Sequence, residues 1–453
     1  MTKRQRLVLG IMVFGCFFGV MCSTMTNVAL PVLMKVFGIS SARVQWVTNG
    51  YLLVNALMIP VSAYLIKRYS YRNLFLGFTI IFALGTLVGA MAPSFWLVVV
   101  GRMIQALGAG VMMPLVNVLA MTFADKHHRG RVMGLVGLAF NFSPIIGPTV
   151  AGFILDYLSW RYLFILLLPF TLLSLLLAWL VMPHVAKVEQ QAFNVVGLVT
   201  CSFALLCMLM GLSDLGTKPL FSWAVLGNLL LGLGIWLVFV LTQRQSDHPF
   251  LNLNVLANWQ YALAIGINGL VVATMFGNTI LLPLLLQDVM KESAVVTGLV
   301  ILPGALSTGL LSPVSGRFFD RYPARWLITY GIAVDLLGTA MQAFLGVHAG
   351  PIEVALWQWV RQFGIVMILI PIQTHALSQL SKSLLPDGVA VFNTTRQIFA
   401  SFGMALVVAM VNLTDHRYSV GTSRVGIQVG FLTCFILLVI AIILGQGLRT
   451  ERR

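Results

Sequence analysis

Charged residues are scarce in this chain of 453 residues: only 9% are Asp, Glu, Lys or Arg, whereas 59% are hydrophobic. A soluble globular domain carries about 25% charged residues, so this composition cannot supply a water-exposed surface for a chain of this length. Acids are scarcer than bases, with 13 Asp and Glu against 28 Lys and Arg. The composition excludes soluble enzymes, nucleic-acid-binding proteins and secreted proteins, and it predicts an all-α polytopic membrane protein.

Cysteines are also few, and motifs for catalysis are missing. The sequence has no glycine-rich phosphate loop and no His–Glu pattern of metal ligands. The cysteines fall within apolar runs without metal-ligand spacing, so we expect small buried residues rather than disulfides. We therefore expect no metal, no cofactor and no enzymatic activity. The five cysteines are Cys16, Cys22, Cys201, Cys207 and Cys434.

The net charge of +15 resides mainly in the short segments between apolar runs. When these segments are assigned alternately to two sides of a bilayer, the side of the N-terminus receives eighteen Lys and Arg and the opposite side seven. Loops rich in Lys and Arg stay in the cytoplasm. The asymmetry predicts a multi-pass protein of the cell membrane with both termini cytoplasmic, and it explains the charge without a nucleic-acid partner.

Long apolar runs recur along the whole chain, and a helix needs about 20 such residues to cross a bilayer. Turn signals such as Ala92-Pro93-Ser94 divide the longer runs. The sequence therefore predicts fourteen transmembrane helices: 7–30, 44–66, 73–92, 95–123, 131–155, 161–182, 193–214, 220–242, 259–285, 294–316, 326–347, 352–378, 388–412 and 425–448.

An internal repeat relates the two ends of the chain. Residues 60–72 match residues 313–325 at six of thirteen positions, and both segments connect two predicted helices on the cytoplasmic side. Parallel repeats of this kind build transporters with a site near the membrane midplane. Two further pairs recur at similar separations: Asn27…Pro31 with Asn278…Pro283, and Arg102…Pro114 with Arg361…Pro371.

The repeat predicts a division of the chain into three parts. Residues 1–182 form an N-terminal bundle of six helices, and residues 259–453 form a C-terminal bundle of six. Residues 183–258 contribute two inserted transmembrane helices and their linkers.

The predicted helix 131–155 carries a stripe of small residues. Ser143, Gly147 and Ala151 are spaced by four, so they lie on one face and permit close approach of another helix. Pro148 removes a backbone hydrogen bond and bends the helix. We expect this face, together with Gly152, to form the seam between the two bundles, although ordinary helix packing would use the same pattern.

These motifs resemble those of the major facilitator superfamily. Gly147-Pro148…Gly152 resembles its antiporter motif, and Gly101-Arg102…Gly108 resembles its fourth-helix arginine motif. With fourteen helices the chain is most similar to the drug:proton antiporter family, near the lincomycin-type multidrug permeases. The resemblance implies a major facilitator fold and export of lipophilic or cationic toxic compounds by proton antiport and alternating access. Its partners would be a small drug-like molecule, protons and the bilayer, with the chain acting as a monomer.

Two departures from the family pattern bear on coupling and gating. Cys22 stands where the family usually has an acid in the first helix, which favours an alternative function: a proton-independent facilitator or metabolite exporter. Lys67 replaces the aspartate of the first cytoplasmic turn, so a charge latch would depend more on Asp320 in the second copy. We expect the cytoplasmic gate to comprise Arg68, Arg72, Gly316, Asp320, Arg321 and Arg325.

Four charged residues lie inside predicted helices, where each costs about 2.5–3.5 kcal/mol and suggests a function: Arg102, Asp335, Arg361 and Arg396. Asp335 is the acid nearest a helix centre, and a desolvated carboxylate can exchange protons near neutral pH. Asp335 and Arg102 are therefore our proton-coupling candidates. The alternative is that Asp335 pairs with a buried arginine and locks helices together; we favour such structural roles for Arg361 and Arg396.

Uncharged amides also occur within the predicted helices. Some would bond helices together and others would contact substrate, and the sequence alone does not separate the two groups. Our candidates for a substrate cavity are Asn27, Gln105, Asn141, Asn278, Gln358 and Asn393.

Overall fold

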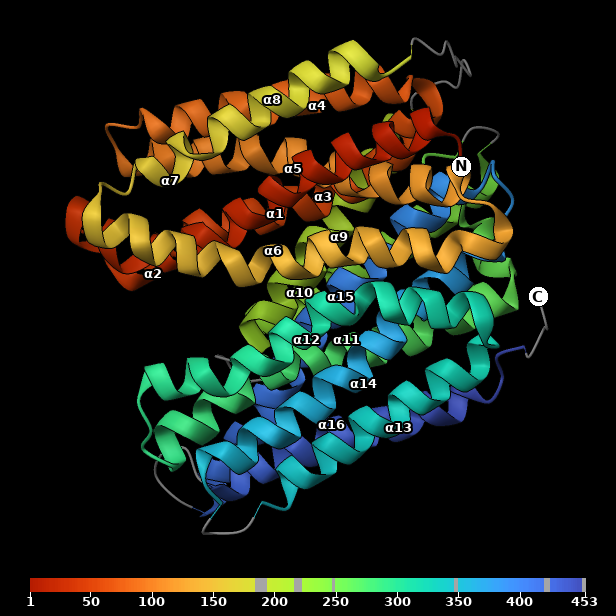
Figure 1. Ribbon diagram of the computed structural model, residues 1–453. Helices are drawn as coiled ribbons and strands as arrows, with labels where there is room; N and C mark the ends of the chain where they lie inside the picture. Colours follow the sequence, from red (N-terminus) through yellow and green to blue (C-terminus); the bar gives the residue numbers. More distant parts are fainter. Residues whose placement is uncertain (184–193, 216–221, 247–248, 346–348, 419–423, 450–453) are drawn as a thin grey trace.

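A computed structural model describes residues 1–183, 194–215, 222–246, 249–345, 349–418 and 424–449. Within these ranges the chain is built of helices, and no strand occurs (Figure 1). Thirteen helices of the described part are long and apolar enough to cross a membrane. The helix α13 (Ala324–Ala343), which matches the predicted span 326–347, is not among the thirteen; it carries Asp335 and Gln342. The predicted all-α membrane class is confirmed.

The first eight α-helices and one short 3-10 helix form the N-terminal half. α1 packs against α6 and α8, while α3 and α4 both pack on α5. The bounds are α1 (Lys3–Phe37), α2 (Ser41–Val44), α3 (Trp46–Arg68), α4 (Tyr71–Ala90), α5 (Phe95–Phe123), η1 (Lys126–His128), α6 (Arg129–Tyr157), α7 (Tyr162–Ile165) and α8 (Leu167–Val181).

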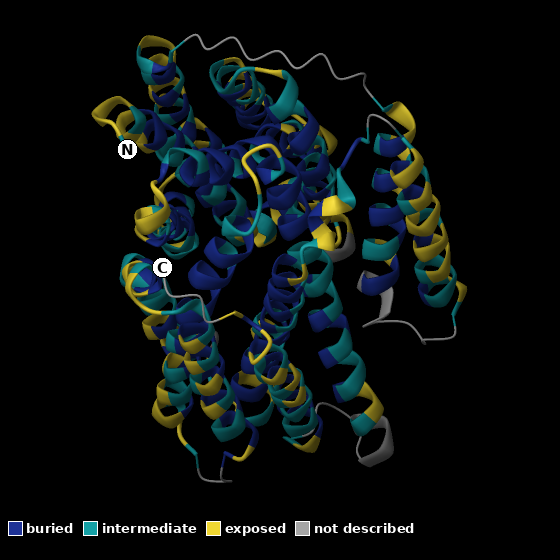
Figure 2. Ribbon diagram, turned by 90° about the vertical axis from the view of Figure 1, so that its right-hand side faces the viewer, coloured by how far each residue is buried: buried dark blue, intermediate teal, exposed yellow. Residues whose placement is uncertain are grey.

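Two helices then form a pair at the edge of the molecule (Figure 2): α9 (Val195–Leu215) and α10 (Asn228–Gln245), the latter preceded by η2 (Trp223–Gly227). α9 contacts α15 and α3, whereas α10 contacts mainly α9. The pair lies within the predicted inserted segment, of which residues 184–193, 216–221 and 247–248 lie outside the described residues.

The last six long helices form the C-terminal half. α13 and α12 pack on α14, α11 packs on α15, and α16 covers α11 and α13. Besides α13, the bounds are η3 (Leu253–Ala257), α11 (Trp259–Pro283), η4 (Leu284–Val289), α12 (Ala294–Arg321), α14 (Pro351–Ser378), α15 (Leu385–Tyr418) and α16 (Arg424–Gly445).

Local sequence explains where several of these helices begin and end. Thr2 and Gln5 form a reciprocal capping box at the start of α1. Ser70 and Ser293 accept backbone N–H groups at the starts of α4 and α12. Gly38 ends α1 with a φ of 60°, a left-handed conformation that glycine adopts without steric cost. These three helices therefore start, and α1 also ends, at residues suited to those positions.

The two halves meet chiefly through α6 and α12, with a second contact between α3 and α15. Figure 1 shows α6 and α12 running side by side toward the end of the molecule that holds the N-terminus. We call this end the terminal face; it contains Met1, the start of α6 and the end of α12.

Candidate functional site

A buried ion pair lies at the centre of the C-terminal half. Arg361 Nε of α14 is 3.0 Å from Asp335 Oδ1 of α13, and their side chains are 1% and 0% exposed. Arg361 also donates to Thr339 Oγ1 at 2.9 Å and to the Thr274 carbonyl at 2.9 Å. The second carboxylate oxygen, Asp335 Oδ2, is buried and has no hydrogen bond within the described residues. The cluster joins α11, α13 and α14 through one charged pair.

This geometry limits what Asp335 can do. Removing one partner of a buried pair leaves an uncompensated charge, at a cost of about 3–5 kcal/mol. Protonating Asp335 would leave Arg361 in that position unless the pair separates first. The structure therefore contains the pairing of Asp335 with a buried arginine that the sequence analysis gave as an alternative. A proton-exchanging role for Asp335 would require this pair to separate.

The N-terminal half has a matching polar cluster around a buried arginine. Arg102 Nη1 of α5 donates to Gln105 Oε1 at 2.9 Å and to Cys22 Sγ of α1 at 3.2 Å. Gln105 Nε2 donates to Thr86 Oγ1 of α4 at 2.8 Å. The guanidinium lies over the Tyr51 ring, 4.1 Å from its centroid, a cation–π arrangement. Arg102 is fully buried, and in the described part of the chain no carboxylate pairs with it.

Each cluster contains an equivalent helix crossing, and comparing the two crossings shows which residues of the two halves correspond. A Cβ on Gly85 of α4 would lie 2.5 Å from the Gln105 backbone nitrogen, and a Cβ on Gly338 of α13 would lie 2.9 Å from that of Arg361. Gln105 and Arg361 therefore occupy equivalent places, and each donates to the threonine that follows the glycine. Small residues at both crossings allow the backbones to approach closely.

The predicted match of Arg102 with Arg361 is therefore wrong by three residues. Arg102 lies three residues before Gln105, and Gln358 lies three residues before Arg361. Arg102 thus corresponds to Gln358, whose Oε1 accepts from Asn278 at 3.0 Å and from Gln342 at 3.0 Å. Among the described residues, the buried arginines Arg102 and Arg361 therefore lie one helical turn apart in the two repeats.

The amide candidates for a substrate cavity do not gather in one place. Gln105, Asn278 and Gln358 are buried in the two polar clusters, and Asn393 is buried and donates to the Val389 carbonyl. Asn141 of α6 donates to Ser312 of α12 at 3.0 Å, between the halves. Asn27 is exposed and accepts from Thr48 at 2.8 Å. Most of these amides bond one helix to another.

Asp320 links the two halves at the terminal face. Its Oδ1 accepts the backbone N–H of Gly130 at 2.8 Å and its Oδ2 accepts that of Arg131 at 2.8 Å. Both groups belong to the first turn of α6, where unpaired N–H groups and the helix dipole favour a carboxylate. Gly316, one turn earlier on α12, packs directly against the Gly130 backbone.

A second link between the halves was missed by the sequence reasoning. Lys67 Nζ, at the end of α3, lies 2.5 Å from Asp387 Oδ2 in the first turn of α15. Asp387 is 0% exposed and also accepts the backbone N–H of Asn252 at 3.0 Å. The sequence did contain a signal for this link. Acids are rare in this chain, and an acid such as Asp387 at the start of an apolar run indicates a function or a charged partner.

Comparison with known proteins identifies the family to which this architecture belongs. A sequence profile for the Major Facilitator Superfamily matches residues 12–404. The chain belongs to the major facilitator superfamily. It is a multi-pass membrane transporter and not an enzyme, as the sequence predicted.

Its relatives include proteins named for drug resistance. The transporter is 33% identical to the uncharacterized MFS-type transporter YcnB of Bacillus subtilis, over 99% of this chain and 96% of that protein. It is 32% identical to the lincomycin resistance protein LmrB of Listeria innocua, over 90% and 87% of the two chains. It is 28% identical to the multidrug resistance protein B homolog of Mycobacterium tuberculosis, over 88% and 75%.

Solved structures share the fold of the transporter. The human organic anion transporter MFSD10 superimposes with a TM-score of 0.72 at 14% sequence identity, over 98% of this chain and 100% of that one. FucP, solved in the outward conformation, superimposes with a TM-score of 0.64 at 13% identity, over 99% and 100%. These likenesses confirm the predicted major facilitator fold.

Three of the other expected gate residues of the transporter form hydrogen bonds within their own half. Arg68 bonds to the Tyr64 hydroxyl, Arg72 donates to the Trp179 carbonyl at 2.7 Å, and Arg325 donates to Gln446 at 2.8 Å. Arg321 is exposed at the end of α12. Gly316 and Asp320 contact the opposite half directly.

The expected seam lies against a different helix. Ser143 Oγ donates to the Phe17 carbonyl of α1 at 2.7 Å, and a Cβ on Gly147 would overlap the Thr24 hydroxyl of the same helix. Ala151 is buried on this face, whereas Pro148 is exposed and a Cβ on Gly152 would meet nothing within 4 Å. The stripe thus packs inside the N-terminal half, which corrects the predicted seam between the halves.

The seam between the halves uses an earlier part of the same helix. Gly130, Gly134 and Gly137 of α6 face α12 and α14. A Cβ on Gly134 would lie 2.7 Å from the Ser312 carbonyl oxygen, and one on Gly309 of α12 would lie 2.9 Å from the Phe142 ring. The contacts run from the terminal face to about the middle of α6, beyond which α6 packs on α1.

Proposed function

We propose that this transporter exports lipophilic or cationic toxic compounds in exchange for protons, by alternating access. The observation that carries the proposal is similarity, over 90% and 88% of this chain, to proteins named for lincomycin and multidrug resistance. The two buried arginine clusters support it, because charged groups inside a membrane protein mark ion and substrate pathways. Asn27 and Asn141 remain our candidates for substrate contact, since both keep accessible surface.

We propose that the terminal face is cytoplasmic and that the transporter faces outward in this structure. The excess of Lys and Arg in loops on the side of the N-terminus supports the orientation. The links Asp320–Gly130 and Lys67–Asp387 close the terminal face, while α6 leaves α12 toward the opposite end. Residues 1–182, 183–258 and 259–453 are the units that we expect to move, within a monomer whose polar clusters need no second chain.

Proton coupling is the finer part of the proposal. Asp335 is our carrier, with Arg361 as the cation that it releases when protonated, and Arg102 is the second candidate. The alternative, a proton-independent facilitator, is favoured by Cys22 at the contact with Arg102, because a neutral thiol there supplies no carboxylate.

The test uses purified transporter in liposomes with an imposed pH gradient. Lincomycin, or a lipophilic cationic dye, is offered on one side, and substrate movement and internal pH are recorded together. We expect substrate to accumulate against its gradient only while the pH gradient lasts, with protons moving in the opposite direction. Adding a protonophore should abolish accumulation but leave downhill movement.

Each other outcome points to a different function. Downhill movement that ignores the pH gradient would establish the facilitator. Failure to move either compound, in liposomes where the protein is folded and inserted, would remove the drug-export proposal.

A further inference from the structure

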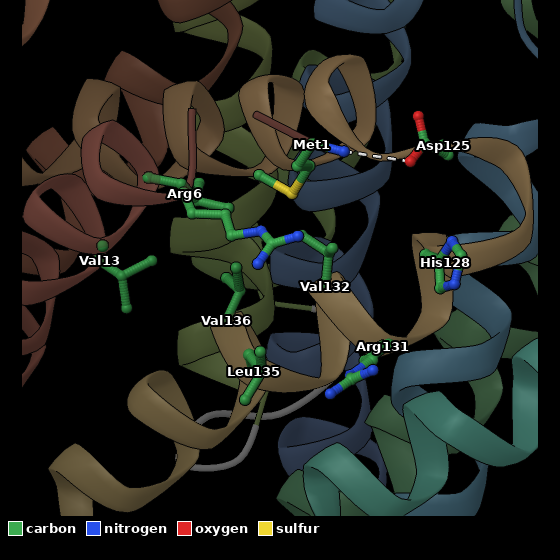
Figure 3. A pocket seen from close by; sticks show the side chains of 11 residues that line it. Met1, Arg6, Val13, Asp125, His128, Arg131, Val132, Leu135 and Val136 are labelled. Carbon is green, nitrogen blue, oxygen red and sulfur yellow. Dashed lines mark hydrogen bonds and ion pairs between the residues drawn. The ribbon is translucent and has the colours of Figure 1, made fainter. Parts of the chain in front are cut away.

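A cavity of about 480 Å³ lies at the terminal face between the beginnings of α1 and α6 (Figure 3). Its walls are apolar and its rim is charged. No part of the transport proposal uses it. Leu9, Gly10, Val13 and Leu135 belong to its walls, and Arg6 and Arg131 lie at its rim.

The cavity exists because α1 and α6 diverge toward the terminal face. The two helices are in close contact further along, where Ser143 bonds to the Phe17 carbonyl. Near the start of α1 that contact is gone, and a Cβ built on Gly10 would meet nothing within 4 Å. Leu135 is 53% exposed, so the apolar wall continues onto the surface that faces lipid.

The rim has two cations in excess. The Met1 ammonium and Asp125 pair at 3.1 Å, and this ammonium holds the pKa of the Asp125 carboxyl below its usual value, so the two charges cancel. Arg6 extends from α1 toward α6 in Figure 3. Within the described residues the Arg6 and Arg131 side chains have no hydrogen bond and no ion pair. Two unpaired guanidinium groups therefore border an apolar cavity at the membrane surface.

We propose that this cavity binds one anionic phospholipid. The phosphate is held by Arg6 and Arg131, because guanidinium groups form strong, often bidentate bonds with phosphate. An acyl chain covers the apolar wall, and removing that wall from water stabilises the complex. Free inorganic phosphate would satisfy the arginines but leave Leu9, Val13 and Leu135 uncovered. This site is independent of the substrate pathway proposed above.

The test measures the thermal unfolding midpoint of the purified full-length transporter in a neutral detergent. The probes are phosphatidylglycerol, phosphatidylcholine with the same acyl chains, and inorganic phosphate, each titrated separately. We expect phosphatidylglycerol to raise the midpoint in a saturable way, phosphatidylcholine to act only at about tenfold higher concentration, and phosphate to have no effect. A tenfold change in affinity corresponds to about 1.4 kcal/mol.

Variants locate the effect. Arg6→Gln with Arg131→Gln removes the cations, and Gly10→Trp fills the cavity while leaving both arginines in place. Each should raise the half-saturating concentration of phosphatidylglycerol about tenfold. Arg4→Gln, on the same exposed turn but outside the cavity, and Gly234→Trp, at an exposed glycine of α10, are the matched controls and should bind as the wild type does.

Three results would overturn the proposal. Equal stabilisation by phosphatidylglycerol and phosphatidylcholine would show that the arginines do not select an anionic headgroup. Stabilisation by inorganic phosphate alone would show that the ligand is a free anion. Unchanged lipid affinity in Gly10→Trp would place the lipid elsewhere. This last variant decides the question even if the double arginine variant fails to fold.

Discussion

Lys67 and Asp387 form an ion pair, 2.5 Å between Nζ and Oδ2, that fastens the end of α3 to the first turn of α15. In the internal repeat Lys67 corresponds to Asp320, which receives the first N–H groups of α6. Both links place a carboxylate at the N-terminal turn of a helix, where the helix dipole stabilises it. In one link the acid, Asp320, belongs to α12 and contacts the first turn of α6. In the other link the acid, Asp387, belongs to the first turn of α15 itself and contacts Lys67 of α3.

Replacing Lys67 with Met should leave the Asp387 carboxylate buried without a cation. We expect the free energy of unfolding to fall by about 3 kcal/mol, measured as a lower thermal midpoint in detergent. Lys67→Arg, which keeps the charge, is the control. The exchange variant Lys67→Asp with Asp387→Lys should recover part of the loss. Wild-type stability in Lys67→Met would show that the pair contributes little.

Replacing Asp335 with Asn should abolish pH-driven export while leaving some downhill movement of substrate. The amide is nearly isosteric with the carboxyl group but cannot change its charge. The same change leaves Arg361 uncompensated, so we expect a loss of about 3–5 kcal/mol in stability. Substrate movement and thermal unfolding are measured on the same preparation.

The double variant Asp335→Asn with Arg361→Gln separates the two roles of Asp335. Removing both charges should restore much of the stability, because no buried charge is left unpaired. Export driven by pH should stay absent. If the double variant recovers pH-driven export as well, Asp335 is only a structural partner of Arg361 and the coupling site lies elsewhere.

Replacing Gly316 with Ala should weaken closure of the terminal face. The added methyl group would overlap the Gly130 carbonyl, and such overpacking costs about 1–3 kcal/mol. The halves can relieve the overlap by separating, so spin labels at Lys126 and Tyr322 should report longer distances. Gly298→Ala, on the same helix with nothing within 4 Å, is the control. Identical distances in both variants would contradict the prediction.

Replacing Gly147 with Leu should impair transport while membrane insertion stays largely intact. A side chain there meets Thr24 and the Met21 carbonyl of α1, so α6 is forced away from α1 by a change that costs about 1–3 kcal/mol. Gly152→Leu, five residues along and facing open space, should transport normally. Full transport by Gly147→Leu would show that this contact is dispensable.

Several features followed from the sequence because their causes are local. An apolar run of about 20 residues becomes a helix in a bilayer, since the backbone must satisfy its own hydrogen bonds. The fourteen predicted spans correspond to observed helices, thirteen of which are long and apolar enough to cross a membrane; the remaining one, α13, carries Asp335 and Gln342. The internal repeat was readable from residues 60–72 and 313–325, and the family from Gly147-Pro148…Gly152 and Gly101-Arg102…Gly108.

Contacts between distant residues were decided by the tertiary structure. Ser143, Gly147 and Ala151 define a close-packing face in sequence, but only the fold shows that the partner is α1 and not α12. Three arginines inside predicted helices were possible partners for Asp335, and the crossing at Gly338 brings Arg361 to it. Spacing along one helix predicts which residues share a face, but it contains no information about which helix covers that face.

The sequence by itself therefore determined the class, the helices and the repeat of this transporter, because backbone hydrogen bonding and bilayer thickness act on each segment separately. The pairing of Lys67 with Asp387, the three-residue offset between Arg102 and Arg361, and the cavity beside Gly10 were decided only by packing. These features depend on distances between helices that are far apart in the chain. Which partner a charged side chain has, and where a cavity remains, are set by the helices that folding packs together.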